Sequence, residues 1–130
     1  MKTSWPRVEI RLSYFFDADH TLPWQTERHR HSYWLECGYC HEINPTMGVT
    51  KTMEESKRDG AAIVERISGK YLNDVLPVPP TAEMLVCWIL ANLPPYWDFV
   101  QVRCYGAMQA RIERHNLTTA WLGKLRADPA

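Results

Sequence analysis

The sequence predicts an α+β domain built on an antiparallel sheet, from the periodicity of its segments and their order. Strand-like alternation of apolar and polar residues marks a first pair of segments, helical spacing marks the next pair, and a second extended pair follows. The order strand, strand, helix, helix, strand, strand places two hairpins in one four-stranded antiparallel sheet with two helices on one face. The six segments cover residues 8–20, 29–37, 53–67, 82–93, 97–105 and 108–114.

The composition fits one globular domain over residues 1–130. Hydrophobic residues make up 45% of the chain and charged residues 23%, and 15 basic side chains balance 15 acidic ones. Zero net charge argues against nucleic acid or an anionic membrane as a partner. No apolar run approaches the roughly 20 residues that span a bilayer, and no secretory signal is recognisable, so we expect a cytoplasmic protein with free thiols.

The first hairpin carries three histidines. From Val8 onward the apolar residues occupy every second position, and this apolar face ends at His20. The next segment also alternates and places His29 and His31 on one face, followed by apolar positions. It ends at the turn sequence "NPTMG", residues 44–48.

Capping residues define both helices. Thr52 opens a capping box for the first helix, and Gly69 suits its end. Thr81 caps the second helix, and the prolines before it keep residues 75–80 extended. The expected buried positions are Met53, Ser56, Gly60, Ile63, Val64 and Ile67 in the first helix, and Leu85, Trp88, Ile89 and Leu93 in the second.

The last two extended segments form a hairpin that turns at Gly106. Residues 116–130 then make a C-terminal extension. We expect one short helix there, through Trp121 and Leu122.

Spacing makes the three histidines a candidate metal site. If the first two strands pair, residues beside their turn face each other with Cβ atoms roughly 5 Å apart, so His20 can join His29 and His31. Three neutral imidazoles at about 2.0–2.1 Å suit Zn²⁺ and leave one tetrahedral position open for water or substrate. On spacing alone, a set of unlinked polar residues near a loop is an equal alternative.

Several motifs resemble those of the 6-pyruvoyl-tetrahydropterin and 6-carboxy-tetrahydropterin synthases, the small zinc enzymes with the tunnelling fold. The resemblance runs from about Val8 to Glu113. The motifs that carry it are "FFDADH", "HRHSYWLE", "NPTMG", "KYLND" and "PTAEML", in the family's order. It implies zinc ligands at His20, His29 and His31, and homo-oligomers, trimers or hexamers, whose sheets close into a barrel with active sites between subunits.

The resemblance also exposes departures at the positions of the family's catalytic groups. Gln25 stands where the family has a catalytic cysteine, and Ser68 and Gly69 stand where it has a proton-relaying Asp-His pair. Cys104 stands where a glutamate anchors the pterin. Gln, Ser and Gly do not titrate near neutral pH, and a thiol poorly replaces a carboxylate that accepts two hydrogen bonds. The usual reaction is therefore not expected.

We expect instead a divergent zinc enzyme, a lyase or a cyclase or isomerase, that acts through an enolate on a small oxygen-rich substrate other than a pterin. Secondary metabolism is one setting for such an enzyme. The expected base is Glu27, two residues before a ligand, with Tyr105 or Glu113 of a neighbouring subunit as alternatives. Expected substrate-binding residues are Gln25, Thr81, Glu83, Cys104 and Tyr105.

Each of these side chains also has an ordinary structural explanation. Glu27 is equally a solvated loop carboxylate, and helix capping accounts for Thr81 and Glu83. Two other functions stay open: a tetrahydropterin synthase whose catalytic groups have moved, and a homologue that binds a ligand without converting it.

Overall fold

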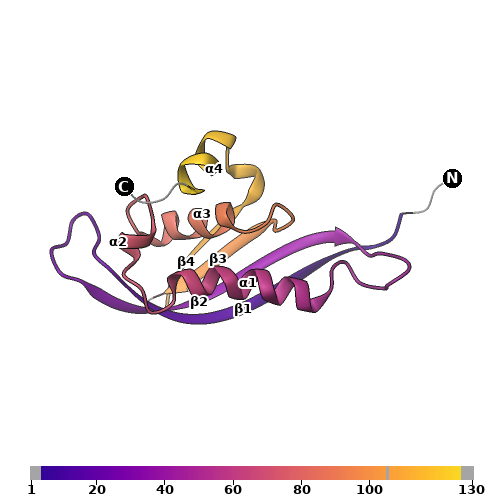
Figure 1. Ribbon diagram of the computed structural model, residues 1–130, viewed down its shortest axis with the longest axis horizontal. Helices are drawn as coiled ribbons and strands as arrows, with labels where there is room; N and C mark the ends of the chain where they lie inside the picture. Colours follow the sequence, from indigo (N-terminus) through magenta and orange to yellow (C-terminus); the bar gives the residue numbers. More distant parts are fainter. Residues whose placement is uncertain (1–3, 105, 127–130) are drawn as a thin grey trace.

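The computed structural model describes residues 4–104 and 106–126, and its strands form one sheet in the order β1-β2-β3-β4 (Figure 1). Every neighbouring pair of strands is antiparallel, as predicted. The elements are β1 Arg7–His20, β2 His29–Glu42, α1 Met53–Ile67, α2 Leu72–Val75, α3 Ala82–Asn92, β3 Phe99–Cys104, β4 Met108–Glu113, a 3₁₀ turn Arg114–Asn116 and α4 Thr119–Arg126.

Both long helices cover the same face of the sheet. Leu12, Cys37, Val100 and Ile112 are direct partners across the four strands, so they mark one face, and all four belong to the buried core or pack against it. On that face α1 contacts β1, while α3 contacts β3 and β4. The predicted α+β fold, with two helices on one face of the sheet, is confirmed.

The predicted caps account for where the helices begin and end. The Thr52 hydroxyl accepts a hydrogen bond from the Glu55 N–H at 3.3 Å, and the Thr81 hydroxyl accepts one from the Met84 N–H at 3.1 Å. Each satisfies an amide that the helix leaves without a partner. Gly69 follows α1 with a φ of 73°, the left-handed conformation that ends many helices.

Two local predictions were wrong. The segment after Gly69 forms the short helix α2, and Val75, expected in extended backbone, is its last residue. Met53 was expected in the buried stripe but is 66% exposed. Side chains of a helix tilt toward its N-terminus, so the side chain of the first residue projects beyond the element that covers the rest.

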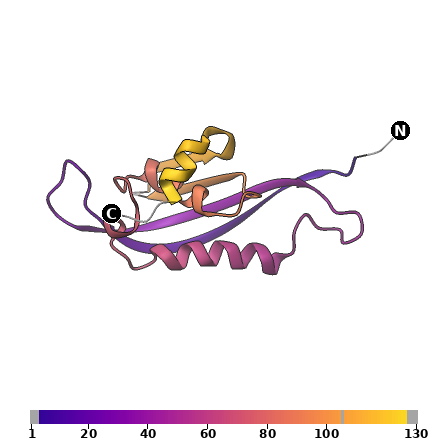
Figure 2. The ribbon, with the colours of Figure 1, turned by 45° about the horizontal axis from the view of Figure 1, so that its top comes forward.

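The C-terminal helix forms a further layer on α3 (Figure 2). Leu125 is fully buried, the Arg126 Nε–H donates to the Ala91 carbonyl at 2.6 Å, and the Asn92 amide donates to the Leu125 carbonyl at 3.2 Å. The predicted tail helix is confirmed. It explains why α3 can be apolar on several sides.

The first hairpin is longer than the rest of the sheet, as Figure 2 shows. β3 pairs only with residues 34–38 of β2, so both ends of the β1–β2 ribbon extend past the shorter strands. The histidines occupy one end of this ribbon, and an apolar hollow lies at the other. No helix within residues 4–104 and 106–126 is long and apolar enough to cross a membrane.

Candidate metal centre

The pairing of β1 with β2 brings the three histidines together. His20 is the last residue of β1 and is the direct partner of His29, the first residue of β2. His31 lies two residues further on, on the same face. The ring centroids of His20 and His31 are 4.8 Å apart, and those of His29 and His31 are 6.1 Å apart.

His20 is held in one orientation by a backbone carbonyl. Its Nδ1 lies 3.0 Å from the Pro80 carbonyl oxygen, and because that oxygen can only accept, the Nδ1–H donates. In the neutral ring Nε2 then carries a lone pair. Nε2 is buried, and no hydrogen-bond partner reaches it from the described part of the chain. A fixed, unprotonated, unpartnered imidazole nitrogen is what a metal ligand requires.

His29 supplies a second buried ring nitrogen, since its Nδ1 also has no hydrogen-bond partner among the described residues. The three rings nevertheless do not form a finished site. Within the described ranges, no three His, Cys, Asp or Glu side chains stand in an arrangement that could hold a metal ion. Zinc binding here therefore stays a prediction.

The environment favours the neutral form of two of the rings. Burial lowers the pKa of His20, although its hydrogen bond to Pro80 and the charge of Asp19 oppose this. Burial, reinforced by the other two histidines, also lowers the pKa of His31. Neutral imidazole is the form that binds a metal ion, so both directions suit a ligand.

The opposite face of the same ribbon carries an ion-pair cluster. Asp19 accepts hydrogen bonds from the Nε of Arg28 and the Nε of Arg30, each at 2.8 Å, and these bonds lower the pKa of its carboxyl. The Arg28 guanidinium also lies 4.3 Å from the ring centroid of Tyr71. These contacts fix the strand ends that carry His20 and His29, because each arginine adjoins a histidine in sequence.

The candidate base lies close to one of the three histidines. Gln25, Glu27 and His29 line one hollow of about 310 Å³, together with Trp24 and Thr26. Glu27 is exposed, whereas the side-chain oxygen of Gln25 lies 3.4 Å from the Leu22 N–H and partly closes the loop. The loop therefore presents the Glu27 carboxylate to solvent, at the hollow that His29 also lines.

The predicted substrate-binding residues fall into separate groups. Cys104 is buried, and burial, together with the negative charge of Glu83, raises the pKa of its thiol. Thr81 uses its hydroxyl as the cap of α3 and follows the proline that orients His20. Tyr105 lies outside the described residues.

Within one chain, Glu113 lies too far along the sheet to reach the histidines. It pairs with Phe99 across β3 and β4, and its carboxylate contacts Arg111 and His115. As the general base, it stays a prediction only for a site to which a neighbouring subunit contributes its Glu113. Sequence reasoning missed Pro80, because a backbone carbonyl partner leaves no signature in the residue type.

Comparison with known families gives one match over most of the chain. The family described as 6-pyruvoyl tetrahydropterin synthase matches residues 9–116. The histidines, the helices α1 to α3 and all four strands lie within or at the edges of that range, and α4 lies beyond it. No curated protein is significantly similar to the chain in sequence.

Solved structures share the fold at low sequence identity. The Caenorhabditis elegans 6-pyruvoyl tetrahydropterin synthase superposes with a TM-score of 0.77 and 14% identity, covering 86% of this chain and 99% of that one. The Plasmodium falciparum enzyme gives 0.64 and 11%, with 86% and 99% covered. A Plasmodium vivax variant in which a catalytic glutamate is changed to cysteine gives 0.63 and 10%, with 84% and 98% covered.

Proposed function

The chain belongs to the 6-pyruvoyl tetrahydropterin synthase family, and from that premise we propose that it is a zinc-dependent enzyme acting on a small, oxygen-rich substrate other than a pterin. The observation that carries the proposal is the buried, unpartnered Nε2 of His20, with Nδ1 committed to the Pro80 carbonyl. A buried polar atom without a partner costs about 1–3 kcal/mol, so its retention favours a ligand for it.

The ring spacing supports one shared ion. Two imidazoles on a tetrahedral zinc with Zn–N bonds of about 2.0–2.1 Å have ring centres about 5 Å apart. The observed separations of 4.8 Å and 6.1 Å lie on either side of that value. Rotation of the His29 and His31 side chains, with the His20 ring kept on the Pro80 carbonyl, would bring the three rings onto one ion.

The chemistry follows from an open coordination position beside a carboxylate. Bound zinc would supply Lewis-acid polarisation of a carbonyl or hydroxyl oxygen, which favours an enolate in lyase, cyclase or isomerase reactions. Glu27 would take or return the proton, since its exposed carboxylate lines the same hollow as His29. Trp24 and Gln25 line that hollow as well and would contact the substrate.

The departures at the family's catalytic positions argue against the usual substrate. In the family, a glutamate carboxylate anchors the pterin, and here the pterin would meet the thiol of Cys104 instead. Losing the charged hydrogen bonds would weaken binding by about 1.5–3 kcal/mol. Without acid–base assistance from the cysteine and the Asp-His pair, the reaction would be roughly 10²–10⁴-fold slower.

A tetrahydropterin synthase with relocated catalytic groups is the second candidate. One observation favours it: a glutamate is the catalytic residue in the Plasmodium vivax 6-pyruvoyltetrahydropterin synthase. Glu27 would then fill the role of the missing cysteine, and Glu83, whose charge acts on the Cys104 thiol, would fill that of the missing anchor.

Metal content tests the zinc proposal. Elemental analysis of the purified protein should give about one zinc per chain. His20→Ala should reduce it to a trace, because three ligands are needed for tight binding. His115→Ala is the matched control, since this histidine is 72% exposed and far from the site, and it should leave the zinc content unchanged. Equal zinc in both variants would contradict the assignment.

Turnover separates the two candidate reactions. With dihydroneopterin triphosphate the zinc-loaded protein should form no product at the rates of an ordinary synthase. Product at such rates, abolished by Glu27→Gln, would establish the second candidate instead. Binding of the pterin without any conversion would favour a homologue that has lost catalysis.

A further inference from the structure

We propose that the apolar hollow at the far end of the β1–β2 ribbon is a second binding site, for a small amphipathic carboxylate. Its volume is about 340 Å³, within the range of small-molecule sites. It is separate from the histidines: His20 lies eight positions beyond Leu12, the nearest lining residue of β1, which is about 26 Å of extended strand. The proposal therefore does not depend on zinc.

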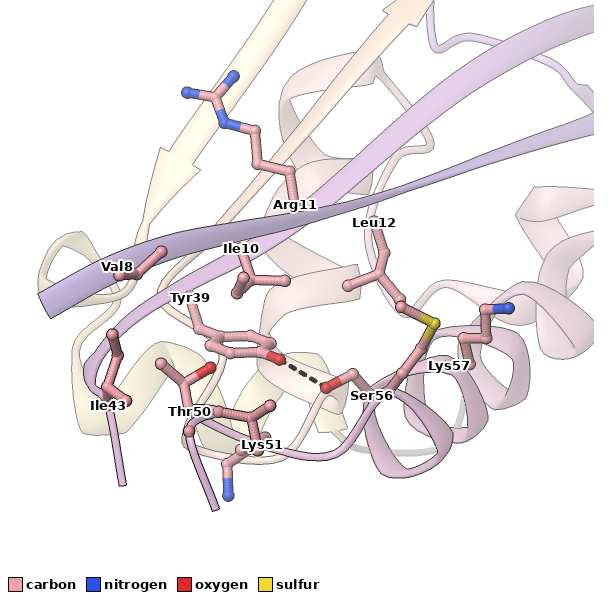
Figure 3. A pocket seen from close by; sticks show the side chains of 13 residues that line it. Val8, Ile10, Arg11, Leu12, Tyr39, Ile43, Thr50, Lys51, Ser56 and Lys57 are labelled. Carbon is pink, nitrogen blue, oxygen red and sulfur yellow. Dashed lines mark hydrogen bonds between the residues drawn. The ribbon is translucent and has the colours of Figure 1, made fainter. Parts of the chain in front are cut away.

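The walls of the hollow are apolar side chains from two strands, a loop and a helix. Figure 3 shows the inner face of β1 on one side and the first turns of α1 on the other. Val8, Val49 and Met53 stay 37%, 41% and 66% exposed although they line it. Burying such surface contributes roughly 25 cal/mol per Å², so an apolar occupant is favoured. The apolar lining residues are Val8, Ile10, Leu12, Tyr39, Ile43, Val49 and Met53.

The two buried hydroxyls at the floor of the hollow are already paired. The hydroxyls of Tyr39 and Ser56, both almost fully buried, hydrogen bond each other at 2.7 Å (Figure 3). Ser56 also hydrogen bonds Tyr96, whose hydroxyl donates to the Asp59 carboxylate. This chain of hydroxyls ends at the Asp59 carboxylate, so both buried hydroxyls already have partners and an apolar inner end of the occupant is favoured.

The loop that forms one wall is held by its own hydrogen bonds. The Asn44 side-chain oxygen accepts from the N–H groups of Thr46 and Met47 at 2.9 and 3.2 Å. Its backbone pairs with Val49 and with Gly48, which has a φ of 74°. The wall is thus built by the fold before any occupant arrives.

The charged side chains that line the hollow are basic. Lys51 and Lys57 line it, and none of the described lining residues is an aspartate or a glutamate. Lys51 is placed by the ring of Tyr96, whose centroid lies 4.2 Å from the ammonium nitrogen. Arg11 extends away on the other side of β1 and is bound to Glu9 at 2.7 Å, so it takes no part (Figure 3). An apolar interior with cations at its mouth selects an apolar chain ending in an anion.

The volume sets the length of the chain. At about 30 Å³ per water-sized group, 340 Å³ holds roughly eleven such groups. A linear carboxylate of about ten to twelve carbons therefore fills the hollow and leaves its carboxylate beside the lysines.

A chain-length series is the first test. Octanoate, decanoate, dodecanoate and tetradecanoate are titrated into the full-length protein by calorimetry, each below its critical micelle concentration. Affinity should rise about fourfold per added CH₂ up to about twelve carbons and then level off, with one carboxylate bound per chain. Absence of saturable binding, or affinity that keeps rising beyond twelve carbons, would overturn the proposal.

Variants test the position and the charge. Ile10→Trp fills the hollow and should abolish dodecanoate binding, and Val8→Trp, at the more exposed rim, repeats the test if the first variant misfolds. Lys51→Gln combined with Lys57→Gln should weaken binding about three- to tenfold. Lys124→Gln, exposed on α4, is the control with no expected effect.

Two further outcomes would count against a carboxylate ligand. Equal binding of dodecyltrimethylammonium would show that the mouth does not select an anion. If Ile10→Trp instead changed the mass of the particle in solution while dodecanoate left the parent protein unaffected, the hollow would be a contact between copies of the chain.

Discussion

Among single residues, Gly60 marks the closest approach of a helix to the sheet. A Cβ at this position would lie 2.1 Å from the Tyr14 hydroxyl oxygen and 2.5 Å from the ring carbon that carries it. The same tyrosine hydroxyl donates to the Lys57 carbonyl at 3.4 Å. Glycine is thus required by the space available, and its conformational freedom is not the reason.

Gly60→Ala should therefore destabilise the protein. Displacing the Tyr14 ring costs about 1–3 kcal/mol, and this outweighs a gain in helix propensity of about 1 kcal/mol. Gly123→Ala in α4, where nothing lies within 4 Å of the added Cβ, is the control and should be neutral or slightly stabilising. Urea unfolding of both variants measures the difference, and equal effects would contradict the close contact.

A second residue-scale prediction concerns alkaline pH. Burial raises the pKa of Cys37 from 9.0 to about 12. The thiol therefore stays protonated in the folded protein while it ionises in the unfolded chain, and stability falls as pH rises above about 9. One such group lowers the free energy of unfolding by about 1.4 kcal/mol between pH 8 and pH 10.

Cys37→Ala isolates that effect. The variant loses stability at every pH because it leaves a small cavity, but its stability should decline about 1.4 kcal/mol less than that of the parent over the same interval. Denaturant unfolding at pH 8, 9 and 10 provides the measurement. Parallel curves for the two proteins would show that Cys37 ionises freely in the folded state.

Residue chemistry was predictable where it depended on the strand period. His20, His29 and His31 share a face because positions two apart in a strand do, and the turn between them fixes the register. Pro80 was not predictable, because a carbonyl contributed from 60 residues away depends on how α3 meets the sheet.

At the scale of elements, α4 stabilises the fold by covering α3. Leu125 is fully buried against it, so Leu125→Ala should cost about 2–4 kcal/mol through lost burial and a residual cavity. Lys124→Ala, next to it but exposed, should change stability by no more than about 0.5 kcal/mol. Thermal unfolding of the two variants decides whether α4 is part of the cooperative unit.

Helix starts followed from capping residues more reliably than helix ends followed from prolines, since Val75 is helical. Thr52 and Thr81 begin their helices as predicted, because each satisfies an amide that the helix itself leaves free. The short helix α2 carries no side-chain cap, so its start had no sequence signal. Its position is set instead by tertiary contacts, among them the bridge between Asp19 and Tyr71.

At the scale of the whole molecule, the sheet is open at both edges. β1 presents a 14-residue edge that is paired on one side only, and β4 presents a shorter edge. Exposed edges tend to pair with other strands, and barrel closure removes them. The predicted trimer or hexamer would satisfy both edges and bring Glu113 of one copy near another.

Light scattering coupled to size exclusion tests that assembly. The mass in solution should be three or six times the 15.2 kDa of the chain. Because paired backbone edges bind without relying on charge, the particle should persist at high salt. A monomeric mass would leave Tyr105 and Glu113 unable to serve a neighbouring site.

The length of the β1–β2 ribbon has a thermodynamic consequence. The metal centre and the apolar hollow share no side chain, and Leu12, the lining residue of β1 nearest to His20, is about 26 Å of strand away, well beyond the distance at which perturbations usually interact. The free-energy changes caused by substitutions at the two ends should therefore be additive. Substitutions at one end of the ribbon should then change the binding specificity of that site and leave the affinity of the other site unchanged.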